Sequence, residues 1–249
     1  MSIICCMLSE PDEIRKMTHT PCLDTILFDL DGTLADTAPD LARTLNLLLV
    51  ERNKPELPFE DIRPHVSNGA AALITLGFDM NSDVPAFAPL RQRFLDLYTE
   101  NLCQRTTLFP GMDELLDQID RQSMHWGVIT NKPARFTEPL LKALGIAQRA
   151  ACIISGDTTS KRKPDPEPMY LACKKIGVQP ENCLYVGDAR RDIDAGLNAG
   201  MQTLVANFGY ISNQDDPGDW QAHGIIDTPL AIIDWLQQYN RNQLAKSGS

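Results

Sequence analysis

The chain has 249 residues, 43% of them hydrophobic and 22% charged, which is ordinary for a globular protein with a substantial core. Its 23 Lys and Arg residues against 33 Asp and Glu residues give a formal net charge of −10. We therefore expect no nucleic acid as a partner, because a phosphate backbone is bound by a cationic surface.

We predict an unstructured leader over residues 1–21. Its apolar start, residues 1–7, is too short to span a bilayer and lacks a basic leader, so we expect neither export nor a membrane partner. Met17 is a hypothetical start of translation, which an intact mass beginning at Met1 or Ser2 would contradict. Seven cysteines without a Cys-x-x-Cys pair favour free thiols and a cytoplasmic location.

The first predicted strand begins near Thr25 and ends in a group of reactive side chains. Asp29, Asp31, Gly32 and Thr33 follow the apolar run of residues 26–28 in the order Asp-Leu-Asp-Gly-Thr. Two carboxylates, a turn-forming glycine and a hydroxyl at a strand end supply a nucleophile, a proton donor and a metal ligand at one point. This arrangement suits phosphoryl transfer.

A helical insert is predicted to follow. Thr37 is expected to cap its first helix, with Pro39 in the first turn and Asp40 three residues after the cap. From there to about residue 107 the pattern is helical, with helices near 70–77 and 89–102 and no convincing strand. We predict a core segment at 22–36, this insert at 37–107, a second core segment at 108–243 and a frayed tail at 244–249.

Helix and strand patterns alternate in the second core segment. Helices are predicted at 112–121, 134–144, 168–176, 193–199 and 229–239, and strands at 126–130, 152–155, 184–186, 203–205 and 224–226. This alternation predicts an α/β fold with a doubly wound parallel sheet, whose ligands bind beyond the carboxyl ends of the strands.

Three further polar segments stand at such positions. Thr130 ends a predicted strand just before a helix, where its hydroxyl and the backbone amides can hold phosphate oxygens. Lys163 directly precedes a proline in a loop, and Asp188 and Asp192 follow a third strand. Because all of these segments fall at strand ends, they are expected to share one site with Asp29.

Together the four segments resemble, in order, the motifs of the haloacid dehalogenase-like (HAD) phosphohydrolases. The resemblance implies a Rossmann-like core with an inserted small cap. It also implies that Asp29 is the nucleophile, that Asp31 protonates the leaving group, and that Thr130 and Lys163 contact the phosphate. The implied cofactor is Mg²⁺, held by Asp29, by the backbone carbonyl of Asp31, by Asp188, and by Asp192 directly or through water.

A cation is also required on electrostatic grounds. At an effective dielectric constant near 20 and a separation of about 4 Å, a phosphate dianion facing one carboxylate costs on the order of 8 kcal/mol. A divalent metal and a lysine beside Asp29 would offset that repulsion. Magnesium is the natural choice for oxygen ligands and a phosphate.

Within the family the chain resembles two groups, the phosphoglycolate phosphatases and the N-acetylmuramic acid 6-phosphate phosphatases. Residues 130–136, 163–168 and 191–193 lean toward the second group. The expected substrate is thus a small phosphorylated molecule carrying a carboxylate, most favourably N-acetylmuramic acid 6-phosphate from cell-wall recycling, with 2-phosphoglycolate as the alternative. The expected substrate-binding residues are Asn68, Gly69, Thr130, Asn131, Arg135, Lys163 and Arg191.

Some alternatives remain open at this point. Arg135 and Arg191 could reach the substrate carboxylate or be ordinary surface charges, and the protein is expected to be a monomer or a homodimer. A phosphoacceptor signalling module also uses an Asp, a Thr, a Lys and magnesium, but lacks the second acid and the insert. A calcium-binding loop is disfavoured because the acidic residues lack its alternating spacing.

Overall fold

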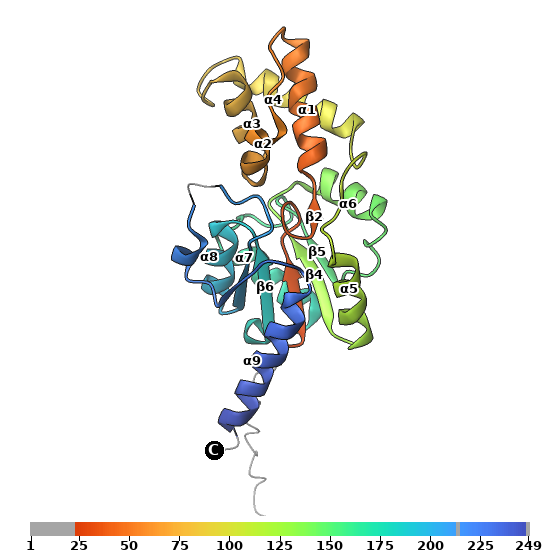
Figure 1. Cartoon of the computed structure of the whole chain (residues 1–249), viewed down its shortest axis with the longest axis vertical. Helices are drawn as coiled ribbons and strands as arrows, with labels where there is room; N and C mark the ends of the chain where they lie inside the picture. The colour runs from red at the N-terminus through yellow and green to blue at the C-terminus, as the bar shows by residue number, and fades with distance from the viewer. Residues whose placement is uncertain (1–22, 213–214, 248–249) are drawn as a thin grey trace, which may run out of the picture.

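The computed structural model describes residues 23–212 and 215–247, and Figure 1 shows its arrangement. A sheet flanked by helices forms one part, and a second group of helices stands above one edge of that sheet. The predicted leader and the Met17 hypothesis concern residues outside the described part.

The sheet has six parallel strands, in agreement with the predicted fold class. Across the sheet they are β5 (Cys152–Ile154), β4 (His125–Ile129), β1 (Thr25–Phe28), β6 (Cys183–Gly187), β7 (Gln202–Ala206) and β8 (Gly224–Ile226). Because the chain winds outward from β1 in both directions, β1 lies at the switch point between β4 and β6, where ligands of such sheets bind.

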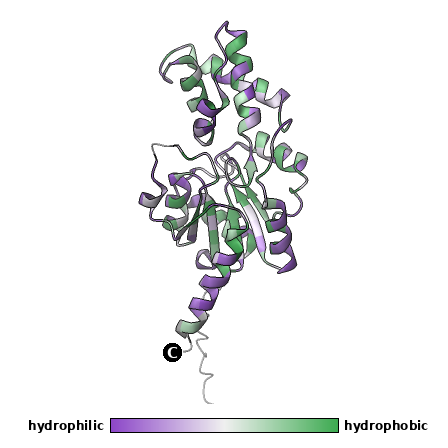
Figure 2. Ribbon diagram, viewed as in Figure 1, coloured by the Kyte–Doolittle hydropathy of each residue, from purple (hydrophilic) through white to green (hydrophobic). Residues whose placement is uncertain are grey.

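Helices cover both faces of the sheet, and β1 shows why. Ile26 and Phe28 pack into the cluster that includes α5 (Met112–Arg121) and α9 (Ala231–Ser247), whereas Leu27 packs into the cluster on the other face. Successive strand residues point to opposite faces, so a strand that is apolar throughout is buried on both. Figure 2 shows this largely hydrophobic layer between helices with hydrophilic outer sides.

The remaining elements of this part follow the predicted alternation. They are α6 (Ala134–Ala143), α7 (Glu167–Ile176), α8 (Arg190–Ala199) and the short 3₁₀ helices η2 (Pro180–Asn182) and η3 (Pro217–Trp220). The α7 and α8 helices pack on the face that Leu27 shares. Apart from the end of α9, each predicted helix and strand in this segment is present with its ends shifted by at most three residues.

The insert is helical, as expected. It contains α1 (Ala38–Glu51), α2 (Phe59–Ile62), the 3₁₀ helix η1 (Arg63–Asn68), α3 (Gly69–Phe78) and α4 (Phe87–Glu100). Leu45 and Leu48 of α1, Ile74 of α3 and Phe94 of α4 are fully buried in its interior. We refer to this insert as the cap, and its boundaries at 37 and 107 stay a prediction.

Two short strands join the cap to the sheet and were not predicted. β2 (Ala35–Asp36) pairs antiparallel with β3 (Thr107–Leu108), so the chain enters and leaves the cap side by side. A strand of two residues is too short to produce a hydrophobic alternation, which is why the sequence pattern does not reveal it.

The predicted capping arrangement at the start of α1 is wrong in its contacts. Thr37 occupies the cap position, but its side chain makes no capping hydrogen bond and instead donates to Asp31 Oδ1 at 2.6 Å. The carboxylate of Asp40 accepts hydrogen bonds from the backbone N–H groups of Arg105 and Thr106, at 2.9 to 3.1 Å. Both side chains therefore brace the connections of the cap.

The predicted tail at 244–249 also begins too early. The α9 helix continues to Ser247. Its apolar stripe fades near Tyr239, but a formed helix propagates through good helix formers until a breaker occurs, and residues 231–247 contain neither Gly nor Pro. No helix among the described residues is long and apolar enough to cross a membrane.

Candidate active site

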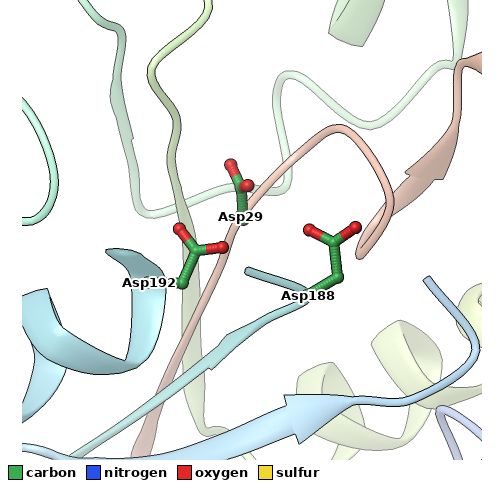
Figure 3. Close-up of side chains that lie close together, drawn as sticks. All are labelled: Asp29, Asp188 and Asp192. Atoms are coloured by element: carbon green, nitrogen blue, oxygen red, sulfur yellow. The ribbon is translucent and has the colours of Figure 1, made fainter. Parts of the chain in front are cut away.

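Three carboxylates converge at the carboxyl edge of the sheet (Figure 3). Asp29 follows β1, Asp188 follows β6, and Asp192 lies in the first turn of α8. Each offers an oxygen within 4.8 Å of the others, and all three residues are buried. Asp192 is held by a hydrogen bond from the backbone N–H of Ala189 to its Oδ2 at 3.0 Å, as expected for an acid at a helix start.

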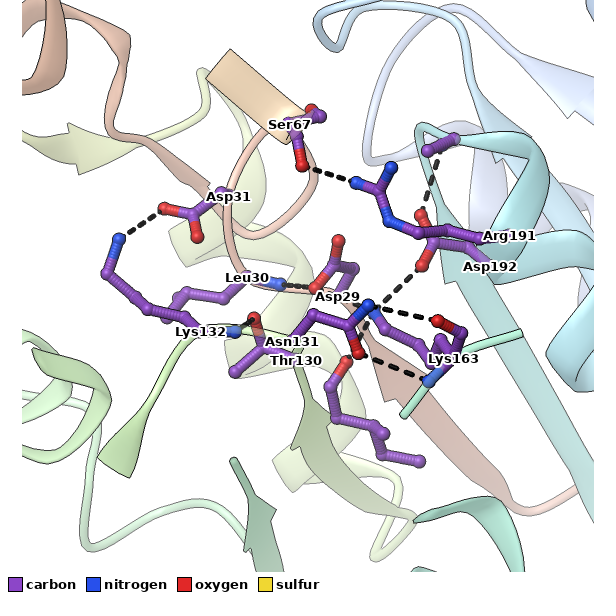
Figure 4. Close-up of polar contacts among 12 residues, drawn as sticks. Asp29, Leu30, Asp31, Ser67, Thr130, Asn131, Lys132, Lys163, Arg191 and Asp192 are labelled. Atoms are coloured by element: carbon purple, nitrogen blue, oxygen red, sulfur yellow. Dashed lines mark hydrogen bonds and ion pairs between the residues drawn. The ribbon is translucent and has the colours of Figure 1, made fainter. Parts of the chain in front are cut away.

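Lys163 lies beside two of these acids, Asp29 and Asp192 (Figure 4). Its Nζ is 2.9 Å from Asp29 Oδ1 and 2.7 Å from Asp192 Oδ1, and its side chain has no exposed surface. The backbone carbonyl of Ile129 and the hydroxyl of Tyr185 also accept from this ammonium group, at 2.9 and 2.8 Å. The predicted position of Lys163 beside the nucleophile candidate thus agrees with the structure.

Burial makes the charged forms of these acids costly. It raises the pKa of Asp29 from 3.8 to about 6, although the ammonium of Lys163 opposes the rise. Burial, together with the charges of Asp192 and Asp29, raises the pKa of Asp188 from 3.8 to about 7. One ammonium group therefore does not compensate three carboxylates, and the cluster favours an additional cation.

The surroundings of Asp188 fit a metal ion. Its Oδ2 accepts hydrogen bonds from Ser67 Oγ at 2.8 Å and from the backbone N–H of Tyr210 at 2.9 Å. Its Oδ1 is buried and has no hydrogen-bond partner within residues 23–212 and 215–247. Buried carboxylate oxygens without partners are suited to a hard divalent cation. A Cβ at Gly32 would lie 2.0 Å from Asp188 Oδ2, so only glycine leaves room for this carboxylate.

Asp31 points away from the three acids. Its Oδ1 accepts from Thr37 Oγ1 at 2.6 Å and from Lys132 Nζ at 2.9 Å. The Lys132 ammonium also lies 4.8 Å from the centre of the Tyr98 ring, in the cap. Although burial opposes it, the carboxylate of Asp31 raises the pKa of Lys132 above its ordinary value. This separation gives the two acids of the first segment different surroundings.

Thr130 and Asn131 connect the end of β4 to the loop that carries Lys163. Thr130 Oγ1 accepts a hydrogen bond from the backbone N–H of Lys132 at 3.1 Å. The Asn131 amide both donates to the carbonyl of Lys163 at 3.1 Å and accepts from its N–H at 3.2 Å. Asn131 therefore positions the lysine through the backbone, a role that its place in the sequence did not reveal.

A pocket of about 380 Å³ opens from these residues toward the cap. Asp29, Asp31 and Thr130 line its inner end. Cap residues line much of the rest, among them Val66, Ser67, Asn68, Gly69, Arg91, Phe94 and Tyr98. A ligand that reaches Asp29 therefore contacts both the sheet and the cap.

Comparison with known proteins identifies the family. The model of the haloacid dehalogenase-like hydrolases matches residues 26–206, which include all four sequence motifs. The chain belongs to this family. The sequence-based assignment to the HAD-like phosphatases is thereby confirmed.

Individual relatives of this HAD-like chain carry two different names. An N-acetylmuramic acid 6-phosphate phosphatase of Pseudomonas putida is 42% identical over 84% of the chain and 94% of the relative. A phosphoglycolate phosphatase of Xanthomonas campestris pv. campestris is 41% identical over 82% of the chain and 92% of the relative. The resemblance to both groups is confirmed, and one percentage point of identity does not separate them.

A solved structure gives the same picture of the fold. The crystal structure of a predicted phosphoglycolate phosphatase from Haemophilus somnus 129PT superposes with a TM-score of 0.77 at 31% identity, covering 85% of this chain and 97% of that one. The HAD-like core and the cap therefore occur together in a related protein.

The substrate-binding residues predicted in the cap, on α6 and on α8 lie at the pocket of this HAD-like structure. Asn68, Gly69, Arg135 and Arg191 all line the pocket. Two N–H groups of Arg191, however, already donate to the cap. One donates to the carbonyl of Ser67 at 2.5 Å (Figure 4) and the other to Asn68 Oδ1 at 3.1 Å. That Arg191 reaches the substrate carboxylate stays a prediction.

Sequence reasoning missed three residues of the site. Lys132 stands two residues after Thr130, and a positive charge so close to a predicted phosphate-binding residue could have identified it. Tyr98 shares a helical face with Phe94, a pattern that predicts burial but not a pocket wall. Ser67 gave no signal, because its contact with Asp188 joins residues 121 positions apart.

Proposed function

We propose that the protein is a magnesium-dependent phosphomonoesterase that acts through a phosphorylated Asp29, most favourably on N-acetylmuramic acid 6-phosphate. One observation carries the proposal: a buried carboxylate at the inner end of a pocket, 2.9 Å from a fully buried lysine and beside two further acids. Its Oδ1 accepts from Lys163 and from the N–H of Leu30, while no described residue donates to its Oδ2.

In the first step an oxygen of Asp29 attacks phosphorus, and the bond from phosphorus to the leaving oxygen breaks. Asp31 gives its proton to that oxygen, and in the second step it accepts a proton from the water that hydrolyses the aspartyl phosphate. Thr37 and Lys132 both bind Oδ1 of Asp31, which fixes the orientation of its other oxygen. Lys163 supports the charge that develops on the phosphoryl oxygens.

Asp29, Asp188 and Asp192 would hold Mg²⁺, together with the backbone carbonyl of Asp31. When bound, the ion supplies positive charge that offsets the repulsion between the phosphate and the carboxylates. The buried Oδ1 of Asp188 supports this assignment, since it otherwise stays without a partner among the described residues.

The size of the pocket supports a substrate larger than a two-carbon acid. A pocket of about 380 Å³ that extends from Asp29 to the cap leaves room for a sugar ring. The relative in Xanthomonas campestris pv. campestris, named as a phosphoglycolate phosphatase, supports 2-phosphoglycolate as the second candidate.

Two measurements test the proposal. With Mg²⁺ present, kcat/KM for N-acetylmuramic acid 6-phosphate is expected to exceed that for 2-phosphoglycolate, and the reverse order would favour the second candidate. Rapid quenching during turnover, followed by peptide mass spectrometry, should find phosphate on Asp29. Multiple turnover without any adduct on that residue would contradict the mechanism for either substrate.

A further inference from the structure

The wall of the pocket carries more positive than negative charge, in contrast to the protein as a whole. The chain has a net charge of −10, yet five cationic side chains and only two carboxylates line this pocket. The cations are Arg91, Lys132, Arg135, Arg162 and Arg191, and the carboxylates are Asp29 and Asp31. A cationic wall in an acidic protein selects for a small polyanion.

Three of the five cations already have partners. Lys132 pairs with Asp31 at 2.9 Å, and Arg191 donates to the cap residues Ser67 and Asn68. Arg162 donates to the carbonyl of Gly156 at 2.5 Å. These groups are positioned by the protein itself.

Arg91 and Arg135 differ from the other three. Neither forms an ion pair with a carboxylate in the described part of the chain, and both side chains are exposed. Arg91 projects from the cap helix α4, and Arg135 stands at the start of α6, with its guanidinium 4.7 Å from the centre of the Phe136 ring. One cation without an acidic partner therefore comes from each side of the pocket.

Apolar side chains lie between these arginines and the reacting end. Tyr98 of α4 packs against Phe136 of α6 with ring centres 5.3 Å apart. The Tyr98 ring is also 4.8 Å from the ammonium group that binds Asp31, so it marks the inner end of the pocket. Arg91 precedes Tyr98 by seven residues on the same helical face, which places it about 10 Å farther along α4.

This spacing decides which anion the arginines can bind. A two-carbon acid keeps its carboxylate a few bonds from phosphorus and cannot extend two helical turns beyond Tyr98. A phosphosugar with an acidic substituent across its ring can place phosphate at Asp29 and a carboxylate near Arg91. The guanidinium group also matches a carboxylate with paired N–H donors.

We propose that Arg91 of the cap and Arg135 of the core bind the carboxylate of a sugar-sized substrate and so determine specificity, while the buried pair Tyr98 and Phe136 holds together the two helices that carry them. This inference rests on the proposed phosphatase function and adds the residues that select the substrate. The receptor draws on both parts of the molecule, so it is complete only when the cap lies over the sheet as it does here.

A pair of matched substrates tests the inference. N-acetylmuramic acid 6-phosphate and N-acetylglucosamine 6-phosphate differ by the carboxylate-bearing arm, so the ratio of their kcat/KM values isolates its recognition. We expect the wild type to prefer the first, and Arg91→Gln and Arg135→Gln each to lower the ratio about tenfold, which corresponds to about 1.4 kcal/mol. Arg91→Lys should retain part of the preference, because the charge remains.

Arg93→Gln is the matched control. Arg93 lies on the same helix, loses the same charge and pairs with Glu51 at 2.6 Å, but does not line the pocket. Its ratio should equal that of the wild type. A ratio within twofold of wild type in both Arg91→Gln and Arg135→Gln would overturn the inference.

The inference and the proposed function fail in different ways. If the magnesium-loaded wild type does not cleave p-nitrophenyl phosphate, the phosphatase function is contradicted, and the inference with it. A wild type that cleaves p-nitrophenyl phosphate but shows no preference for the carboxylate-bearing sugar would overturn the inference alone. The same p-nitrophenyl phosphate assay on each variant checks that its reacting end is intact.

Discussion

The two ends of the pocket are built differently. At the inner end, Asp29 and Thr130 are 4% exposed and follow strands of the sheet, and the adjacent Asp188 and Lys163 are at most 3% exposed. At the outer end, Arg91 and Arg135 are exposed side chains on helices. The backbone of the sheet fixes the positions of the buried residues at the inner end. The positions of Arg91 and Arg135 depend instead on which face each helix turns toward the pocket.

Because of this difference, the residues that carry out the reaction at the inner end are distinct from those that select the substrate at the outer end. The buried lysine cannot be replaced by an apolar side chain without leaving two buried carboxylates, Asp29 and Asp192, without their cation. An exposed arginine on a cap helix can be replaced at little cost to stability, since surface substitutions rarely exceed about 0.5 kcal/mol. Relatives with similar cores can therefore act on different phosphate esters, as the two names among the relatives suggest.

The largest expected effect comes from Asp29→Asn. The amide cannot form the covalent acyl phosphate, so kcat should fall about 10⁴-fold or more for every phosphate ester tested. Steady-state kinetics with purified protein measure the loss. Thermal unfolding should show a folded variant, since the neutral amide costs less to bury than the carboxylate. Wild-type turnover by this variant would remove Asp29 from the mechanism.

Lys163→Met should affect both activity and stability. Removing the ammonium leaves Asp29 and Asp192 without the cation that lies within 2.9 Å of both, which costs on the order of 3–5 kcal/mol in the metal-free protein. Denaturant unfolding with and without Mg²⁺ measures this cost, and Mg²⁺ should recover part of it. Lys161→Met, at an exposed pair with Asp165, is the matched control and should leave the stability nearly unchanged.

The inner end of the pocket could be predicted because several of its residues stand directly after strands that the sequence reveals. Asp29, Thr130 and Asp188 each follow a strand that the apolar pattern reveals, and parallel strands end at the same edge of a sheet. The contacts that complete the site were not predictable in this way. Lys132 meets Asp31 across 101 positions, and Ser67 meets Asp188 across 121.

The errors have the same origin. The hydroxyl of Thr37 was expected to bind the backbone at the start of α1, but a tertiary partner, Asp31, takes it instead. The cap also occupies two N–H groups of Arg191, a contact that the sequence did not reveal, and the role of Arg191 toward the substrate stays a prediction. Local sequence shows which hydrogen bonds a side chain is able to make. Which of them it makes is decided by contacts with distant residues, which form only after folding.

The pH dependence of stability should distinguish metal-free from metal-bound protein. The pKa values of Asp29 and Asp188 rise from 3.8 to about 6 and about 7 on folding. Between about pH 4 and pH 7 the folded state therefore binds more protons than the unfolded state, and stability falls as the pH rises. Asp188→Asn should reduce this fall and be about 1–3 kcal/mol more stable than wild type at pH 7.5 without metal.

Adding Mg²⁺ should reverse that order, because the ion binds the ionised carboxylates and stabilises only the folded state. Calorimetric unfolding at pH 5 and pH 7.5 measures both effects, and the gain from Mg²⁺ should be larger at pH 7.5. An equal gain at both pH values, or an equal gain in Asp188→Asn, would contradict the assignment of Asp188 as a metal ligand.

The smallest expected effect concerns Ser67, which belongs to the cap but contacts the metal cluster. Its hydroxyl donates to Asp188 Oδ2 at 2.8 Å, and a single hydrogen bond to a charged group contributes about 1.5–3 kcal/mol at most, less where water can replace it. Ser67→Ala should weaken Mg²⁺ binding a few-fold, measured by calorimetric titration. The change should lie in the affinity for metal and not in the preference between the two sugar phosphates.

Ser160→Ala is the matched control, because that hydroxyl donates to Glu167 on the exposed surface. If Ser67→Ala binds Mg²⁺ as tightly as the control does, the cap does not influence the metal ligands, and the two ends of the pocket are independent. If the affinity falls as expected, closure of the cap and binding of the metal stabilise each other, since a coupling free energy acts equally in both directions. In that case Arg91 would influence only the choice of substrate, whereas η1, which carries Ser67, would influence the metal site as well.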